Sequence, residues 1–178
     1  MTVRMEPAFD TRAFRRALGH FPTGVCVVTA RVDDAFIGMT VNSFNSLSLA
    51  PPLVLFSVDA GAASLPLWRR AEGYAVNVLA ENQKDVSDRF ARSGVNKWEG
   101  TTYAEGLFGA PALPGVAAVL ECAAWATHAA GDHVLFIAEV RRFRTASGRR
   151  PLVFSKGRYA KLHETEFTAS LWPLDIHY

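Results

Sequence analysis

The amino-acid sequence predicts a mainly β fold, in which a closed antiparallel β-barrel is decorated by short helices. The first observation behind this prediction is a series of six or seven segments rich in Val, Ile, Phe and Thr, separated by turn signals. The second is that these segments do not alternate regularly with helices, as they would in a parallel α/β sheet. Closing an antiparallel sheet into a barrel also removes exposed strand edges.

The N-terminal part of the chain is expected to form a short helix followed by a β-hairpin. Asp10 can cap the helix, whose apolar residues recur at helical spacing, and Gly19 can end it. Segments 24–31 and 35–41 have the composition of strands, and an Asp-Asp pair between them favours a turn. The arginines of the helix are expected to face water.

The middle of the chain is expected to hold two buried strands and two short helices. Segments 53–58 and 74–79 are compact apolar runs of the length typical of central strands. Ser64 is expected to cap the first helix. The second helix is expected over about 83–91, with one apolar face and one charged, solvated face.

The last part of the chain combines a long loop with the remaining strands. Residues 92–115 contain five glycines and two prolines, and a loop of this length in a compact domain is usually functional or covers another part of the protein. Strands are expected at 119–127, 133–142 and 151–154. The tail, 163–178, is too apolar to be assigned to disorder and is expected to pack on the body or on a second subunit.

Length, charge and cysteine usage narrow the class of protein. A chain of 178 residues suits a single domain, with a core over about 10–162, and needs neither disulfides nor a structural metal. Cys26 and Cys122 lie in apolar stretches and are expected to be free, buried thiols. A net charge of +2 argues against a dedicated nucleic-acid binder. Because no segment resembles a membrane span or a signal peptide, a cytoplasmic protein without a membrane partner is expected.

The sequence signatures of several common enzyme classes are missing. The chain contains no G-x-G-x-x-G after a strand, no P-loop and no G-x-S-x-G, so Rossmann, P-loop and α/β-hydrolase chemistry lack support. His128 and His133 flank one turn without a third ligand at a metal-binding spacing, so no metal site is expected. The arginines of 141–150 fit either a solvated loop or an anion-attracting patch.

Segment 40–49 is the most informative part of the sequence, because its hydroxyls and amides alternate with apolar side chains. Such groups suit the polar edge of a planar heterocycle, although a polar barrel rim would have the same composition. The helix starts expected at Ser64 and near 82–84 would add backbone N–H groups and a partial positive charge, which suit a phosphate.

Five blocks of the sequence, in their order, carry a family resemblance. The blocks are FRRALGHFPTGVCVVTA (14–30), TVNSFNSLSLAPPLVL (40–55), YAVNVLAENQ (74–83), Gly131-Asp132-His133 with Glu139-Val140, and Pro151-Leu152 to Gly157-Arg158-Tyr159. Together they resemble the short-chain flavin reductases of the flavin reductase-like family. The resemblance implies an FMN-binding split β-barrel with antiparallel Greek-key topology, usually a homodimer. It also implies hydride transfer from NADH or NADPH to FMN or FAD and delivery of reduced flavin to a separate monooxygenase.

The resemblance further implies which residues contact the two cofactors. Residues implied at the isoalloxazine ring are Thr40, Val41, Asn42, Ser43 and Ser46. Residues implied near the ribityl chain and phosphate are Ser57, Val58, Asp59 and Ser64, with further phosphate contacts at Asn82, Gln83 and Lys84. Residues implied to face the nicotinamide are His133 and Tyr159, with Lys156 and Arg158 beside them. His133 is the implied catalytic residue, which would orient the nicotinamide and relay a proton.

Two alternatives stay open at this point. A reductase with bound flavin that acts on a corrinoid or a ferric chelate would keep the fold and change the acceptor. A flavin-binding protein without turnover would keep both the fold and the flavin. The sequence does not distinguish FMN from FAD or NADH from NADPH.

Overall fold

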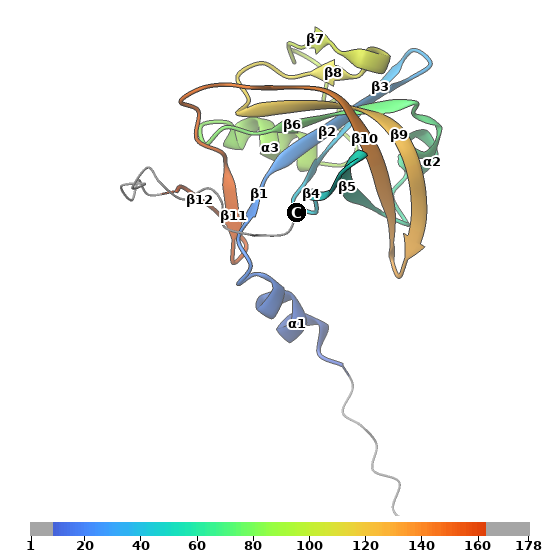
Figure 1. The fold of residues 1–178 in the computed structure, drawn as a ribbon. Coiled ribbons are helices and arrows are strands. Elements are labelled where there is room, and N and C mark those ends of the chain that lie inside the picture. The colour runs from blue at the N-terminus through green and yellow to red at the C-terminus, as the bar shows by residue number, and fades with distance from the viewer. Residues whose placement is uncertain (1–8, 163–178) are drawn as a thin grey trace, which may run out of the picture.

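The protein is built around one seven-stranded antiparallel sheet (Figure 1). The computed structural model describes residues 9–162, so the apolar tail expected to pack on the body, 163–178, lies outside the described residues. The strand order is β3-β2-β6-β9-β10-β5-β4. The strands are β2 (Cys26–Val32), β3 (Ala35–Val41), β4 (Asn45–Leu49), β5 (Pro52–Asp59), β6 (Gly73–Val78), β9 (Ala118–Ala130) and β10 (His133–Thr145). The prediction of a mainly β, antiparallel fold is confirmed.

The barrel is split rather than closed. In the part of the chain that the structure describes, the edge strands β3 and β4 pair with β2 and β5 but not with each other. The polar residues after β3 leave the ladder, and β4 is largely exposed. The Ser57 N–H of β5 donates to Ser43 Oγ at 3.1 Å, so a side chain continues the pairing of β5 beyond the first residue of β4. The closed barrel predicted from strand patterning is therefore wrong, and the split form implied by the resemblance is confirmed.

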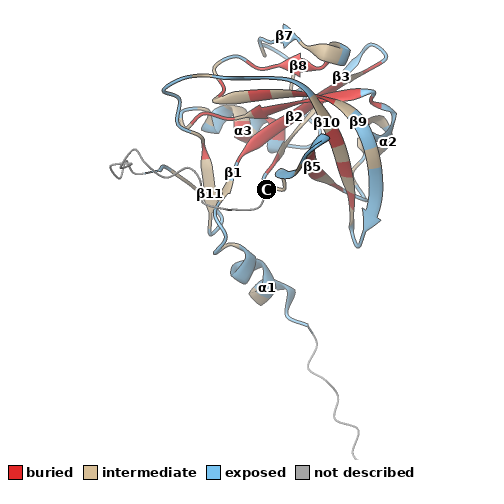
Figure 2. Cartoon of the chain, in the orientation of Figure 1, coloured by how far each residue is buried: buried red, intermediate tan, exposed pale blue. Residues whose placement is uncertain are grey.

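Two smaller sheets and the helices surround the main sheet. The small sheets are β1-β11-β12, made of β1 (Thr23–Gly24), β11 (Val153–Ser155) and β12 (Arg158–Ala160), and the pair β7 (Ala104–Glu105) and β8 (Pro111–Ala112). The helices are α1 (Thr11–Leu18), α2 (Leu65–Arg70), α3 (Lys84–Ala91) and a 3-10 turn η1 (Leu107–Gly109). In Figures 1 and 2, α1 projects away from the barrel and is mostly exposed. No helix within residues 9–162 is long and apolar enough to span a membrane.

Strand β2 divides the hydrophobic core into two parts, because both of its faces are buried. One face, with Val28, packs in the barrel interior, where the rings of Phe56 and Phe136 stack with centroids 5.3 Å apart. The other face, with Val27, packs in a second cluster that includes Phe90 of α3. Gly38 of β3 admits this helix closely, since a Cβ there would lie 2.7 Å from the Phe90 ring. These contacts fix α3 against the outside of the sheet.

The long loop predicted at 92–115 contains local structure that the sequence did not reveal. Trp98 anchors its first half, because its Nε1–H donates to the Phe36 carbonyl at 2.9 Å. Glu121 of β9, which is only 1% exposed, holds the second half by accepting the Leu107 N–H at 2.7 Å. Burial would raise the pKa of Glu121, but hydrogen bonds from Arg142 and Leu107 outweigh it and keep the pKa below its ordinary value.

The arginines of 141–150 are mostly paired with carboxylates. Arg142 and Arg144 contact Glu121 at 2.6 and 2.9 Å. Two more pairs are Arg141 with Glu139 at 2.7 Å and Arg150 with Glu81 at 2.8 Å. These pairs compensate only part of the positive charge of the segment, because Arg142 and Arg144 share the single carboxylate of Glu121.

Replacing Glu121 by glutamine is expected to lower the free energy of unfolding by about 1–3 kcal/mol, since a buried N–H and two guanidinium groups lose a charged acceptor. The pKa of Glu121 is depressed in the folded state, so its contribution is complete above its ordinary pKa of 4.5 and is lost as the pH falls through the lower folded pKa. Urea denaturation at several pH values measures both effects. The exposed Glu105 provides the control, and its change to glutamine is expected to cost less than about 0.5 kcal/mol. Equal stability of the native chain and E121Q would contradict this role of Glu121.

Candidate functional site

The first candidate site is a cavity of about 200 Å³ where β3 ends beside α3 and the β11–β12 hairpin. Its lining residues are Val25, Thr40, Val41, Asn42, Ser87, Ala91, Phe154 and Tyr159. Three of the residues implied at the isoalloxazine ring and one implied at the nicotinamide therefore line the same space. The lining combines apolar side chains with polar groups, which is the combination that a planar heterocycle needs. This lining is compatible with a flavin ring.

A hydrogen-bond network holds Tyr159 at this cavity. Its hydroxyl donates to Asp88 Oδ1 at 2.8 Å and lies 2.9 Å from Ser87 Oγ. Lys84 contacts Asp88 at 2.6 Å and lies 5.3 Å from the centre of the Tyr159 ring. The Lys84 ammonium and the Tyr159 hydroxyl lower the pKa of Asp88, which keeps the carboxylate charged. Because the hydroxyl is bound to α3, the ring of Tyr159 is the part left to meet a ligand.

Two of the residues implied at the isoalloxazine ring, Thr40 and Val41, have side chains that are already hydrogen-bonded or buried, so mainly their backbone is left to meet a ligand. The Thr40 hydroxyl donates to the Ser87 carbonyl at 2.7 Å, so it already has an acceptor inside the protein. The Val41 side chain is 7% exposed and packs in the barrel core. Val58, implied near the phosphate, is 1% exposed and packs in the same core. Asn42 and Ser46 are exposed.

A second group of implied residues lies along β5 and the start of β10. Ser57 is joined to Ser43 by the hydrogen bond described above, and Asp59 is the register partner of His133. The Asp59 carboxylate accepts the Gly61 N–H at 2.7 Å, so it fixes the bend after β5. Strand pairing thus brings Ser43, Ser57, Asp59 and His133, which are far apart in the sequence, to one side of the split barrel.

His133 opens β10 and is held by the residue before it. Its Nδ1 lies 2.7 Å from Asp132 Oδ1, and its side chain is 42% exposed. This hydrogen bond is the main reason that the pKa of Asp132 lies below its ordinary value, and the charge of Arg15 contributes further. Since one ring nitrogen is occupied by Asp132, the other is available to a ligand. The hydrogen bond to Asp132 thus orients the imidazole of His133 at the start of β10.

The helix starts expected to bind phosphate are mostly engaged in internal contacts. Ser64 stands at the N-cap position of α2 but makes no capping bond, and its hydroxyl accepts Trp68 Nε1–H at 3.2 Å. Gln83 uses both ends of its amide: Oε1 accepts the Ala80 N–H at 2.9 Å, and Nε2 donates to the Pro114 carbonyl at 2.9 Å. Asn82 is exposed. Ser64 thus stands at the N-cap position as predicted, but the side-chain capping bond expected there is absent, and α2 has only six residues.

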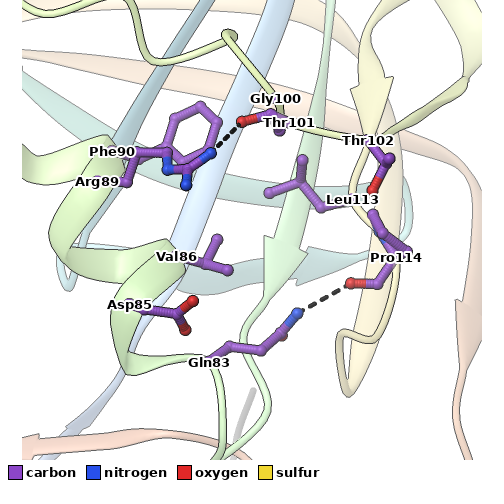
Figure 3. Close-up of a pocket in the computed structure, with 10 residues that line it drawn as sticks. All are labelled: Gln83, Asp85, Val86, Arg89, Phe90, Gly100, Thr101, Thr102, Leu113 and Pro114. Atoms are coloured by element: carbon purple, nitrogen blue, oxygen red, sulfur yellow. Dashed lines mark hydrogen bonds between the residues drawn. The ribbon is translucent and has the colours of Figure 1, made fainter.

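Gln83 also lines a different cavity, of about 230 Å³, between α3 and the loops around Thr101 and Pro114 (Figure 3). Arg89 reaches across this space and donates to Thr101 Oγ1 at 3.0 Å. Gln83 is the one residue from the implied flavin contacts that lines it. The implied contacts are therefore not gathered in one cavity of the described chain.

Lys156 and Arg158 lie on the hairpin that carries Tyr159, and both are exposed. Lys156 lines a cavity shared with α1, whereas Tyr159 lines the cavity at the end of β3. Ser87 and Asp88, which join Tyr159 to α3, were not predicted as site residues, because the helical pattern placed Asp88 on the solvated face. The i,i+4 spacing of Lys84 and Asp88 was the one available signal of that ion pair.

Comparison with known proteins places these features in a family. Residues 18–163 match the model of the flavin reductase like domain. The chain is 42% identical over 152 residues to the FMN reductase (NADH) SmoA of Agrobacterium fabrum, covering 85% of this chain and 86% of the relative. It is 35% identical over 174 residues to the reductase subunit HsaB of a flavin-dependent monooxygenase of Mycobacterium tuberculosis, covering 97% of this chain and 93% of HsaB.

A solved structure supports the same assignment. The NADH:FAD oxidoreductase SgcE6 of Streptomyces globisporus, in complex with NAD and FAD fragments, superposes with a TM-score of 0.82 at 37% sequence identity. The match covers 86% of this chain and 93% of SgcE6. The family model spans more than half of the chain, the relatives align over most of their lengths, and the split barrel carries the implied residues at the ends of its strands. This chain therefore belongs to the flavin reductase-like family.

Proposed function

We propose that this protein transfers a hydride from NADH or NADPH to FMN or FAD and supplies reduced flavin to a separate oxygenase. The observation that carries the proposal is the cavity between the end of β3, α3 and the β11–β12 hairpin. Residues implied at the flavin and a residue implied at the nicotinamide both line this cavity. The relatives support it, because SmoA is an NADH-dependent FMN reductase and HsaB is the reductase subunit of a monooxygenase.

The chain's own residues supply position and electrostatics for this reaction. The two cofactors carry the hydride chemistry when they are bound, so no protein nucleophile is required. The backbone of 40–43, where the chain leaves the ladder, and the hydroxyl of Ser46 would bind the polar edge of the flavin ring. N–H groups aimed at that edge would stabilise the negative charge that develops during reduction. The ring of Tyr159, fixed through Asp88, would limit where the nicotinamide can lie.

His133 is proposed to orient the nicotinamide. Asp132 holds one nitrogen of its ring at 2.7 Å, so the imidazole presents the other nitrogen in a defined direction. Hydride transfer depends steeply on alignment of the donor and acceptor atoms, so an oriented contact of this kind contributes to the rate.

We also propose a homodimer, on the basis of α1. This helix has no buried residue, and Phe14 and Leu18, one helical turn apart, are 48% and 57% exposed. Phe9 and Phe21, on either side of the helix, are 73% and 75% exposed. A helix of eight residues is not stable alone in water, so its apolar face requires a partner surface. A second copy of this chain would provide that surface.

The purified protein is expected to oxidise NADH or NADPH only when FMN or FAD is added. Steady-state oxidation of NADH and of NADPH, measured while FMN or FAD is titrated, tests this dependence on flavin. The same measurement shows which nucleotide and which flavin the protein prefers. Turnover that requires a corrinoid or a ferric chelate instead of free flavin would favour the alternative acceptor. Tight flavin binding without turnover would favour the alternative of a flavin-binding protein and contradict the proposed reaction.

His133→Ala is expected to slow flavin reduction in a single turnover by roughly tenfold or more while flavin binding is retained, because the nicotinamide loses its alignment. Stopped-flow reduction and a flavin-binding titration separate the two effects. His128→Ala, at an exposed histidine of β9 in the same hairpin, is the matched control and is expected to react like the native protein. An unchanged single-turnover rate in His133→Ala would remove His133 from the mechanism.

Replacing Phe14 and Leu18 together by serine is expected to convert the dimer into a folded monomer, because the apolar face of α1 is lost. Sedimentation velocity measures the mass, and circular dichroism checks that the barrel is retained. Val95→Ser, which changes a half-exposed apolar side chain away from α1, serves as the control and should sediment like the native protein. A native chain that sediments as a monomer would contradict the proposed dimer.

A further inference from the structure

A cavity of about 430 Å³ lies between α1 and the turn that joins β11 to β12. Its lining residues are Arg15, Arg16, Gly19, His20, Lys156 and Gly157. Four of the six lining residues are Arg, Lys or His, the other two are glycines, and none is acidic. Lys156 is the one lining residue that the resemblance implies at a cofactor.

Within residues 9–162 this cavity carries an excess of positive charge, although the charge of Arg15 also acts on the carboxylate of Asp132 and lowers its pKa. Arg15, Arg16 and Lys156 form no ion pair there, in contrast to the arginines of β10, which contact Glu121 and Glu139. The C-terminus of α1 carries a partial charge of only about −0.5, which is far less than three permanent cations. Cations held close together without a counterion attract an anionic ligand.

The walls of the cavity are joined by the backbone. The Lys156 N–H donates to the Gly19 carbonyl at 2.8 Å, which ties the hairpin turn to the end of α1. Lys156 and Gly157 have φ values of 49° and 76°, as a tight two-residue hairpin turn requires. The same hairpin places Tyr159 at the flavin cavity, three residues from Lys156. One elongated ligand could therefore lie on both sides of the hairpin.

We propose that this cavity binds a phosphate group of the flavin or of the nicotinamide dinucleotide, with Arg15, Arg16 and Lys156 as its ligands. The inference rests on the proposed function and deepens it. Guanidinium groups match the geometry of phosphate oxygens, and a lysine adds a point charge. The expected phosphate contacts at Gln83 and Lys84 are already engaged with Ala80, Pro114 and Asp88, whereas these three cations are not.

The test compares ligands with and without phosphate. The variants are Arg15→Gln with Arg16→Gln, and Lys156→Asn, because asparagine tolerates the positive φ at this turn. Arg69→Gln, on the exposed face of α2, removes the same charge elsewhere and serves as the matched control. Fluorescence titration measures the dissociation constants of FMN and riboflavin for each protein. Steady-state kinetics measures KM for NADH and for 1-benzyl-1,4-dihydronicotinamide, a hydride donor without phosphate.

A flavin phosphate in the cavity predicts that the variants bind FMN roughly tenfold to 100-fold more weakly and bind riboflavin as the native protein does. A dinucleotide phosphate predicts instead that KM for NADH rises by a similar factor, while KM for the phosphate-free donor is unchanged. Added salt should weaken the native interaction in the same selective way, since exposed charges are screened.

Two results would overturn the proposal. One is native affinity for FMN and NADH in both variants. The other is an equal loss for ligands with and without phosphate, which would indicate a structural role of α1, as would an altered sedimentation coefficient. Riboflavin reduction by the native protein tests the reductase activity separately. If the phosphate proposal fails, this activity still supports the proposed reaction. If the native protein does not reduce riboflavin or FMN, the proposed reaction fails, and no variant is needed to show it.

Discussion

The burial of β2 on both faces is the constraint on which the rest of the structure depends. A strand covered on one side by the barrel interior and on the other by α3 leaves that helix no freedom to shift, because Phe90 fills the second cluster over Gly38. Ser87 and Asp88 belong to α3, so their positions follow from the position of this helix. The Tyr159 hydroxyl is hydrogen-bonded to both, which positions Tyr159 and its hairpin. An apolar packing contact on the outside of the sheet thus determines the geometry of a polar site at its edge.

Most of the polar side chains of the candidate site are hydrogen-bonded within the protein, so few of them are free to contact a ligand. The Thr40 hydroxyl, the Gln83 amide and the Tyr159 hydroxyl all have partners inside the protein. These internal hydrogen bonds follow from the free-energy cost of leaving a buried or half-buried polar group without a partner. In the described part of the chain, the groups left without a side-chain partner are backbone at the end of a strand, ring faces, one imidazole nitrogen and the cations between α1 and the β11–β12 turn. Groups of this kind suit the proposed function, in which the protein positions the reactants and the cofactors react.

Local patterns were enough to predict most of the strands and helices, but not that the barrel is split between β3 and β4. The hairpin over 24–41, the strand at 53–58 and the helix at 83–91 follow from apolar periodicity and turn residues, and each is present. β12 and the β7–β8 pair were not predicted, because strands of two or three residues are stable only through partners distant in the sequence. The carboxylate of Glu121 was also missed: nothing near it in the sequence shows that Arg142 and Leu107 converge on it. For the site, the resemblance implied roles for His133 and Tyr159, which stay predictions, and the sequence could not show which hydroxyls and amides are engaged internally.

The pairing of β1 with β11 joins Thr23 to Phe154, so these two strands meet only after the strands of the seven-stranded sheet, which lie between them in the sequence, have been synthesised. Both cavities beside the β11–β12 hairpin depend on this pairing, and contacts between residues this far apart form late because a long loop must be closed. During synthesis, the strands β2 to β10 can assemble before the hairpin has left the ribosome. The two cavities would then be completed after the main sheet.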